Sequence, residues 1–484
     1  MNVNYAELFC ALGPETGLVV GAVLVLGLDL FAGRGRSQVQ RMTVASGLAA
    51  LAILGAMTAT ISAGTGGPVF GGVMTLDPLT LAARLGVLGL ALLTVAMARD
   101  VVRLPNPAEY IAVLLFATTG FTLMAAAQQL LLAFLALELA SLSLYVLAGF
   151  DKSRPQSAEA ALKYFLFGGV SAAFLLFGFS LIYGLTGSIE LPEIARQIAT
   201  QPPSTLLVVA LVMMLVAFGF KAAAAPFHLW APDVYEGAPP TSAALIASAS
   251  KLAGFTLFTR LLWGGFSAAP GHSTVPSWLP VVAILAALSL VLGNLAALAQ
   301  SNVRRLLAYS AIAHAGALLL GVMVAGRSGP GPLIYYAATY GLATVGAFGV
   351  IAVVDRAGSC QSLADLAGLY RRSPLLAACL ALFVLSLAGI PPLAGFFGKF
   401  VVFAAAFKAG GLAHSSGWLA LLAIAMSAVG LYYYLLILKQ ALVARGADTA
   451  PRILVPANAA IALIVTAALI VVLGLAPSLV LSLF

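Results

Sequence analysis

The stretch STLLVVALVMMLVAFGFKAAAAPFHLWAPDVY, residues 204–235, decides the fold class of this chain. It is longer than the ~20 apolar residues with which a helix crosses the hydrocarbon core of a bilayer. Pro226 lies near its middle, and proline removes a helical hydrogen bond and clashes with the preceding turn. We therefore predict a membrane helix broken at mid-membrane, where irregular backbone must be buried in protein or line a wet cavity.

The composition extends this prediction to the whole chain. Of 484 residues, 62% are hydrophobic and 8% are charged, against roughly 25% charged in soluble domains. We predict an all-α polytopic membrane protein that binds the lipid bilayer and no nucleic acid, because its net charge of +8 reports topology. Cys10, Cys360 and Cys379 are isolated, which argues against iron–sulfur, zinc and disulfide sites. No cleavable signal peptide is expected.

Apolar runs predict about fourteen transmembrane helices, and no loop is long enough for a soluble domain. The expected spans are 8–31, 42–63, 77–98, 108–127, 129–150, 158–185, 204–235, 241–265, 278–300, 303–325, 331–354, 374–409, 417–440 and 454–481.

A second overlong span, 374–409, contains Pro391 and Pro392 and is also predicted to be broken. Broken helices five spans apart suggest two five-helix repeats of inverted topology, as in many transporters. We expect one membrane domain in four parts. They are an N-terminal group of three helices (1–107), a first repeat (108–265), a second, inverted repeat (278–440) and a C-terminal helix (454–484).

Basic residues gather in the loops after spans 1, 3, 5, 9, 11 and 13, whereas the opposite loops carry few. The positive-inside rule places the basic loops in the cytoplasm. A multi-pass protein of the bacterial cytoplasmic (inner) membrane with both termini on the periplasmic side is the expected arrangement.

Charged residues inside the apolar runs are the candidate functional residues, because a charge at the bilayer centre costs at least ~2.5–3.5 kcal/mol. Glu138 and Lys221 are both central in their spans, and a pair between them would offset part of the desolvation cost. A static structural ion pair is the alternative. Lys251 is central in span 241–265 and too deep to snorkel easily. Arg84 is interpreted as structural, with Asp77 as a partner.

Four further residues are weighed as proton-transfer groups. Lys163 lies near the cytoplasmic end of its span, where snorkelling competes with function. His228 follows Pro226 and His314 is central, so either could relay protons or simply be hydrogen-bonded. Lys399 follows the second break in the outer half of the membrane.

Together these residues predict a row of titratable groups joined by water: Glu138, Lys163, Lys221, Lys251, His314 and Lys399. The spacing of Tyr336, Tyr340 and Thr344 places them on one helix face that could hold such water. No dinucleotide fold, P-loop or nucleophile elbow is present in the sequence, so this chain is expected to hold no redox cofactor of its own.

Three motifs resemble those of the proton-pumping, antiporter-like subunits of respiratory complex I. They are FGFKAAAAPFHLWAPDVYEGAPP (218–240), VRRLLAYSAIAHAG (303–316) and LAGIPPLAGFFGKF (387–400). Fourteen spans and a lysine at 399 resemble subunit N, whereas the similar M subunit carries glutamate there and the L subunit is longer.

The resemblance implies a proton-translocating subunit of NADH:quinone oxidoreductase, next to the antiporter-like M and small membrane subunits. FMN, iron–sulfur clusters and quinone would then belong to partner subunits. By motif position, Glu138 and Lys221 form the central pair, Lys251 is the connecting lysine and Lys399 the terminal one. The family often has Lys-Arg where this chain has Arg304-Arg305, which puts a titrating role at 304 in doubt. A subunit of a cation/proton antiporter or of a membrane-bound hydrogenase is the alternative.

Overall fold

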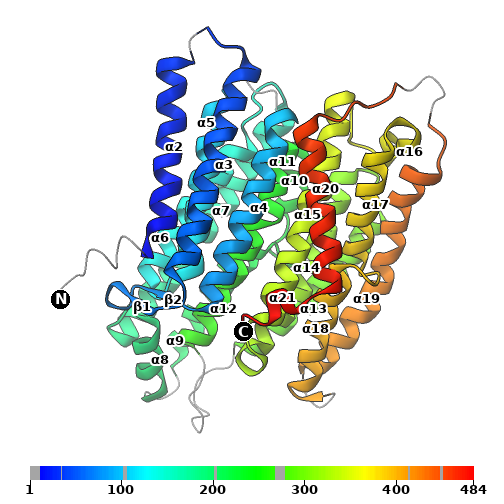
Figure 1. Ribbon diagram of the computed structural model, residues 1–484. Coiled ribbons are helices and arrows are strands. Elements are labelled where there is room, and N and C mark those ends of the chain that lie inside the picture. The colour runs from blue at the N-terminus through cyan, green and yellow to red at the C-terminus, as the bar shows by residue number, and fades with distance from the viewer. Residues whose placement is uncertain are drawn as a thin grey trace.

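Apolar helices form most of the chain, as the composition predicted. The computed structural model describes residues 11–33, 35–101, 106–200, 204–266, 278–411, 415–446 and 451–484. Within these residues, thirteen helices are long and apolar enough to cross a bilayer, and they stand side by side in one bundle (Figure 1). The unbroken ones are α2 (Gly13–Ala32), α3 (Gln38–Ala63), α4 (Pro78–Val101), α5 (Pro107–Ala126), α6 (Leu130–Ala148), α7 (Pro155–Thr186), α13 (Leu279–Leu298), α14 (Val303–Ser328), α15 (Gly331–Ala357), α19 (Ser415–Leu438) and α20 (Ala457–Leu475).

The first predicted break is confirmed. Helix α9 (Thr205–Ala222) ends at Ala223, which has a left-handed φ of 55°, and α10 (Trp230–Gly237) follows the break. Two hydrogen bonds hold the break inside the protein. The Ala225 N–H donates to Ser289 Oγ on α13 (2.9 Å), and Trp230 Nε1 donates to the Phe220 carbonyl (3.0 Å).

The second predicted break is also confirmed. Helix α17 (Pro374–Ala388) ends at Gly389, whose φ of 86° is left-handed, and α18 (Ala394–Lys408) begins after Pro391 and Pro392. Each half has 15 residues, so neither crosses alone. The two halves together provide the fourteenth crossing that the sequence predicted.

A third interruption differs from the prediction of one continuous helix over 241–265. Helix α11 (Pro240–Ala247) and helix α12 (Ala249–Gly265) are separated by Ser248. The Ser248 hydroxyl donates to the Ala244 carbonyl (2.6 Å), a back-bond that commonly bends helices. The segment carries no glycine or proline at this point, which is why sequence patterning missed it.

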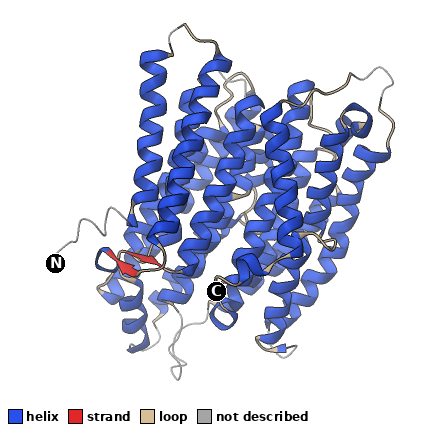
Figure 2. Cartoon of the chain, in the orientation of Figure 1, coloured by secondary structure: helices blue, strands red, loops and turns tan. Residues whose placement is uncertain are grey.

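Several short elements were not predicted. The α3–α4 connection forms a small hairpin, coloured red in Figure 2, from β1 (Gly67–Val69) and antiparallel β2 (Met74–Leu76), joined by η1 (Phe70–Gly72). Amphipathic helix α8 (Leu191–Thr200) packs against α12 through Leu191, Ile194 and Ile198. The remaining short elements are η2 (Leu363–Leu366), α16 (Leu369–Arg372), the π-turn η4 (Lys439–Val443) and α21 (Ser478–Leu481).

Two buried arginines tie the N-terminal helices to the rest of the bundle. Arg84 pairs with Glu15 on α2 (2.8 Å), so the expected pairing with Asp77 is wrong. Asp77 instead receives two hydrogen bonds from Arg260 on α12, at 2.6 and 3.0 Å. Arginine reaches several acceptors with its five N–H groups, so partners distant in sequence can satisfy it. The division into inverted repeats stays a prediction.

Candidate functional site

Lys221 occupies the last turn of α9, directly before the first break. Its ammonium group is buried and donates to Ser141 Oγ on α6 (2.8 Å). Glu138 lies one helical turn before Ser141 on the same face of α6, and its Oε1 is buried with no hydrogen-bond partner in the described structure. The Glu138 carboxylate therefore lies near the Lys221 ammonium group, but no ion pair within 4.0 Å joins these two residues.

Lys251 lies three residues after the interruption at Ser248. Its Nζ donates to the Ala311 carbonyl on α14 (2.5 Å) and lies 5.6 Å from the centre of the Tyr340 ring on α15. Lys221 and Lys251 line the same cavity of about 10 Å³, together with Phe218, Ala222, Gly254, Phe255 and Phe258. This volume is at the lower limit of the ~10–15 Å³ that one water molecule needs.

His314 of α14 lies at the centre of a group of tyrosines contributed by two helices, α15 and α19. Its Nδ1 is 2.6 Å from the Tyr336 hydroxyl and its Nε2 is 3.0 Å from the Tyr434 hydroxyl on α19. Its ring centre is 4.7 Å from that of Tyr340, the ring beneath Lys251. His314 is thus hydrogen-bonded through both nitrogens and adjoins the Lys251 site.

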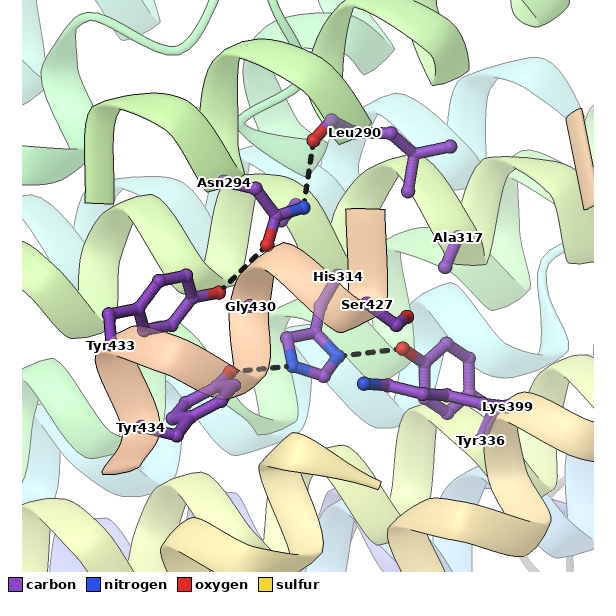
Figure 3. A pocket seen from close by; sticks show the side chains of 11 residues that line it. Leu290, Asn294, His314, Ala317, Tyr336, Lys399, Ser427, Gly430, Tyr433 and Tyr434 are labelled. Atoms are coloured by element: carbon purple, nitrogen blue, oxygen red, sulfur yellow. Dashed lines mark hydrogen bonds between the residues drawn. The ribbon is translucent and has the colours of Figure 1, made fainter. Parts of the chain in front are cut away.

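Lys399 lies in the second turn of α18 and bonds across the second break. Its Nζ donates to the carbonyl of Ala388, the last residue of α17 (3.0 Å). Lys399 and His314 line a cavity of about 20 Å³ with Asn294, Tyr433 and Tyr434 (Figure 3). That volume exceeds the need of one water molecule, so the cavity has room for water between the two residues.

The four groups Lys221, Lys251, His314 and Lys399 therefore follow one another across the bundle, with Glu138 at the α6 end. We call these five residues, Glu138 included, the central row. The lysines bond to one hydroxyl and two carbonyls, all of which are neutral acceptors. Within the described structure, Lys251 and Lys399 therefore have no carboxylate bonded to them that loss of their proton would leave unpaired, whereas Glu138 lies near Lys221.

The structure places Lys163 and His228 apart from the central row. Lys163 pairs with Glu159 (2.7 Å) and Asp233 (2.6 Å) at the end of the bundle that carries the basic loops. His228 lies within the first break, with its ring 6.5 Å from that of Tyr309 and its Nδ1 buried without a hydrogen-bond partner among the described residues. Neither residue lines the two cavities.

Four polar residues of the site were missed by sequence reasoning: Ser141, Asn294, Tyr433 and Tyr434. Ser141 could have been found from its spacing of three residues from Glu138. Tyr433 and Tyr434 come from the run GLYYYLLI, in which nothing indicates which ring faces inward. Tyr336, Tyr340 and Thr344 were predicted to share one helix face. Tyr336 and Tyr340 contact His314, while the Thr344 hydroxyl donates to the Tyr340 carbonyl (2.8 Å).

Comparison with known proteins decides the family. The family described as NADH:quinone oxidoreductase/Mrp antiporter, TM matches residues 127–438, which include every residue of the central row. NADH-quinone oxidoreductase subunit N 2 of Acidobacterium capsulatum is 47% identical, over 99% of this chain and 98% of its own length. The chain belongs to the NADH-quinone oxidoreductase subunit N family. Subunit N of Methylovorus glucosotrophus, at 36% identity over 99% of this chain and 97% of its own, is a more distant member.

Solved structures agree with this family. A chain of respiratory complex I from Thermus thermophilus with bound aureothin matches with a TM-score of 0.79 and 36% identity, over 97% of this chain and 98% of that one. A chain of the Mrp complex from Dietzia sp. has a TM-score of 0.83 at 23% identity, over 100% of this chain and 96% of that one. The second match shows a shared fold and nothing more, so subunit N family membership rests on sequence.

Proposed function

We propose that this chain is the proton-translocating N subunit of an NADH:quinone oxidoreductase in a bacterial cytoplasmic membrane. Support comes from relatives that carry the name of subunit N along their full length and from the similar chain within respiratory complex I of Thermus thermophilus. Partner subunits, among them an M-type subunit and small membrane subunits, would oxidise NADH and reduce quinone with their own FMN and iron–sulfur clusters. This chain would move protons in response and hold no redox centre.

The observation that carries the proposal is the continuity of the central row. Lys221 and Lys251 share one cavity, Lys251 and His314 share the Tyr340 ring, and His314 and Lys399 share the second cavity. A proton that neutralises Glu138 would remove a negative charge near Lys221 and so weaken the hold of Lys221 on its own proton. That proton would pass to Lys251, His314 and finally Lys399 through bound water.

The test is proton pumping per NADH oxidised, measured in vesicles reconstituted with the whole complex. We expect Lys221→Ala to lower this ratio by about tenfold or more, as for loss of a proton-transfer group, while the complex still assembles. Lys408→Ala is the matched control, because Lys408 is exposed at the end of α18 and lies outside the row. Unchanged pumping in the Lys221 variant would overturn the proposal for the row.

Glu138→Gln distinguishes coupling from a static structural role. The substitution keeps the shape of the side chain and removes its charge. Under the proposal, pumping falls while the amount of assembled complex stays the same. An assembly defect alone would favour the structural interpretation, as would normal pumping after both Lys221 and Lys251 are neutralised.

A subunit of a cation/proton antiporter is the second candidate, because the fold is shared with the Mrp complex. The two candidates differ in what co-purifies with the chain in mild detergent. NADH-oxidising subunits support the first, whereas sodium-dependent transport without NADH oxidation supports the second.

A further inference from the structure

Tyr434, on helix α19, is a buried tyrosine that hydrogen-bonds to a member of the central row. Its hydroxyl is 3.0 Å from His314 Nε2 and also hydrogen-bonds to Ser310 Oγ, one helical turn before His314 on α14. On the other side of the imidazole ring, His314 Nδ1 is 2.6 Å from the Tyr336 hydroxyl (Figure 3). Three hydrogen bonds therefore join four buried groups in the order Ser310, Tyr434, His314 and Tyr336.

Every group in this chain of hydrogen bonds can both give and accept a proton. A hydroxyl is a donor and an acceptor, and a neutral imidazole donates from one nitrogen and accepts at the other. The hydrogen bonds can all point from Ser310 toward Tyr336, with the imidazole proton on Nδ1, or all point back, with that proton on Nε2. Both arrangements make the same three hydrogen bonds.

A proton that passes along the chain leaves all four groups neutral. When the Ser310 oxygen receives a proton, it gives its own to the Tyr434 oxygen, which gives its own to His314 Nε2. The Nδ1 proton then passes to the Tyr336 oxygen, and the Tyr336 proton leaves into the cavity of about 20 Å³ that Tyr336 lines with Lys399. In each transfer one O–H or N–H bond breaks as the next one forms. The reverse order carries a proton out of the cavity.

The chain links this cavity to a different part of the bundle. Ser310 is not among the residues that line the cavity, and it lies one turn nearer than His314 to the start of α14 at Val303. One turn corresponds to about 5.4 Å along the helix axis. The hydrogen bonds thus lead along α14, whereas the central row passes from helix to helix.

We propose that Tyr434 is a proton-transfer residue that exchanges protons with His314 Nε2, and that Ser310 allows its hydroxyl to act in both directions. This inference rests on the proposed function, because it adds a transfer step at His314. With Ser310 present, both tautomers of the imidazole keep their hydrogen bonds. Removal of the Ser310 hydroxyl favours donation from Tyr434 to Nε2, and so holds the imidazole proton on Nδ1.

The first test is Tyr434→Phe, which removes the hydroxyl and keeps the ring. We expect proton pumping per NADH oxidised to fall by about tenfold or more, as for loss of a proton-transfer group. Tyr335→Phe is the matched control, because Tyr335 is also buried and its hydroxyl donates to the Leu473 carbonyl (2.8 Å), away from the row. The control should pump as the unmodified complex does. Unchanged pumping in Tyr434→Phe would overturn the inference.

Ser310 provides the second test, which decides the matter where Tyr434→Phe fails to assemble. Ser310→Ala should lower pumping about two- to tenfold, the range that corresponds to one hydrogen bond. Ser310→Thr keeps a hydroxyl and should pump normally. An assembled Ser310→Thr complex that pumps as poorly as Ser310→Ala would contradict the role of the hydroxyl, as would normal pumping by Ser310→Ala.

The double variant Tyr434→Phe with Ser310→Ala shows whether the two residues act in one chain. If Ser310 acts through Tyr434, the double variant pumps no less than Tyr434→Phe alone. Losses that multiply would show independent effects and would overturn the inference. Loss of pumping in Lys221→Ala would leave the proposed function standing, whichever result the Tyr434 and Ser310 variants give.

Discussion

At the scale of single residues, the buried cations of this chain fall into two chemical kinds. Arg84 and Arg260 are paired with the carboxylates of Glu15 and Asp77, at 2.8 and 2.6 Å. The lysines of the central row bond instead to a hydroxyl or to carbonyls. Arginine keeps its charge under all ordinary conditions, whereas a buried lysine can lose its proton. The arginines therefore suit a structural role and the lysines a transfer role.

Replacing Arg84 is expected to lower the stability of the folded protein. Arg84 is 0% exposed, and its guanidinium bonds to the Glu15 carboxylate and to the carbonyls of Ala11 and Thr122. We expect Arg84→Met to destabilise the protein by about 3–5 kcal/mol, because it leaves the carboxylate of Glu15 buried and unpaired. Thermal unfolding of the purified complex in detergent measures the change.

The double variant Arg84→Met with Glu15→Leu is the control for that experiment. Replacing both charges with apolar side chains of similar size is often neutral or stabilising, so most of the lost stability should return. A single variant as stable as the unmodified protein would show that the pair contributes little.

At the scale of helices, each lysine of the row lies beside an interruption. Lys221 is in the last turn before the first break, Lys251 follows Ser248 by three residues, and Lys399 bonds to the last carbonyl of α17. A helix end leaves its last carbonyls without intrahelical partners, and at the second break one of them accepts a hydrogen bond from Lys399. Lys221 and Lys251 instead find their uncharged acceptors on the neighbouring helices α6 and α14. The interruptions and the lysines thus form one arrangement.

A substitution at Gly389 tests whether the second break positions Lys399. The Gly389 φ of 86° suits glycine, and a Cβ there would lie 3.1 Å from Lys399 Cδ. We expect Gly389→Ala to cost about 1–2 kcal/mol from backbone strain. Displacement of Lys399 should also lower proton pumping, by about tenfold.

Gly187→Ala is the matched control for the glycine experiment. Gly187 also ends a helix, with a φ of 66°, and nothing lies within 4 Å of a Cβ there. Thermal unfolding should show a similar loss of stability for both variants, with pumping reduced for Gly389→Ala alone. A similar loss of pumping in both variants would mean that general destabilisation, not displacement of Lys399, is the cause.

The sequence predicts those features of residues and helices that depend on the local backbone alone. Pro226 and the Pro391–Pro392 pair act on their own backbone, so their breaks were predictable. The interruption at Ser248 depends on a side-chain back-bond that serines make only in some helices. Likewise, the neighbours of Lys251 come from α14 and α15, and no pattern within one helix indicates which distant carbonyl or ring meets it.

At the scale of the whole molecule, the central row runs across the bundle instead of along its helices. It begins at α6, continues through α9, α12 and α14, and ends at α18 on the other side (Figure 1). A proton that moves only along this row passes from one helix to the next and does not by itself cross the membrane. Net transport therefore needs one entry and one exit on opposite faces, and the direction of transport depends on which face is cytoplasmic.

Cysteine labelling of intact spheroplasts tests that orientation. Lys152 is exposed in the loop after α6 and Arg196 is exposed on α8, with α7 between them. Helix α7 has 32 residues, so at 1.5 Å per residue it is about 48 Å long, more than the ~30 Å hydrocarbon core. The two positions thus lie on opposite faces.

The basic loops predict that the face of Lys152 is cytoplasmic. In a background whose own cysteines are replaced by serine, a membrane-impermeant maleimide should label Arg196→Cys before lysis and Lys152→Cys only after it. The reverse pattern would invert the orientation. Either result fixes which face of the bundle is cytoplasmic, which continuity of the row alone does not determine.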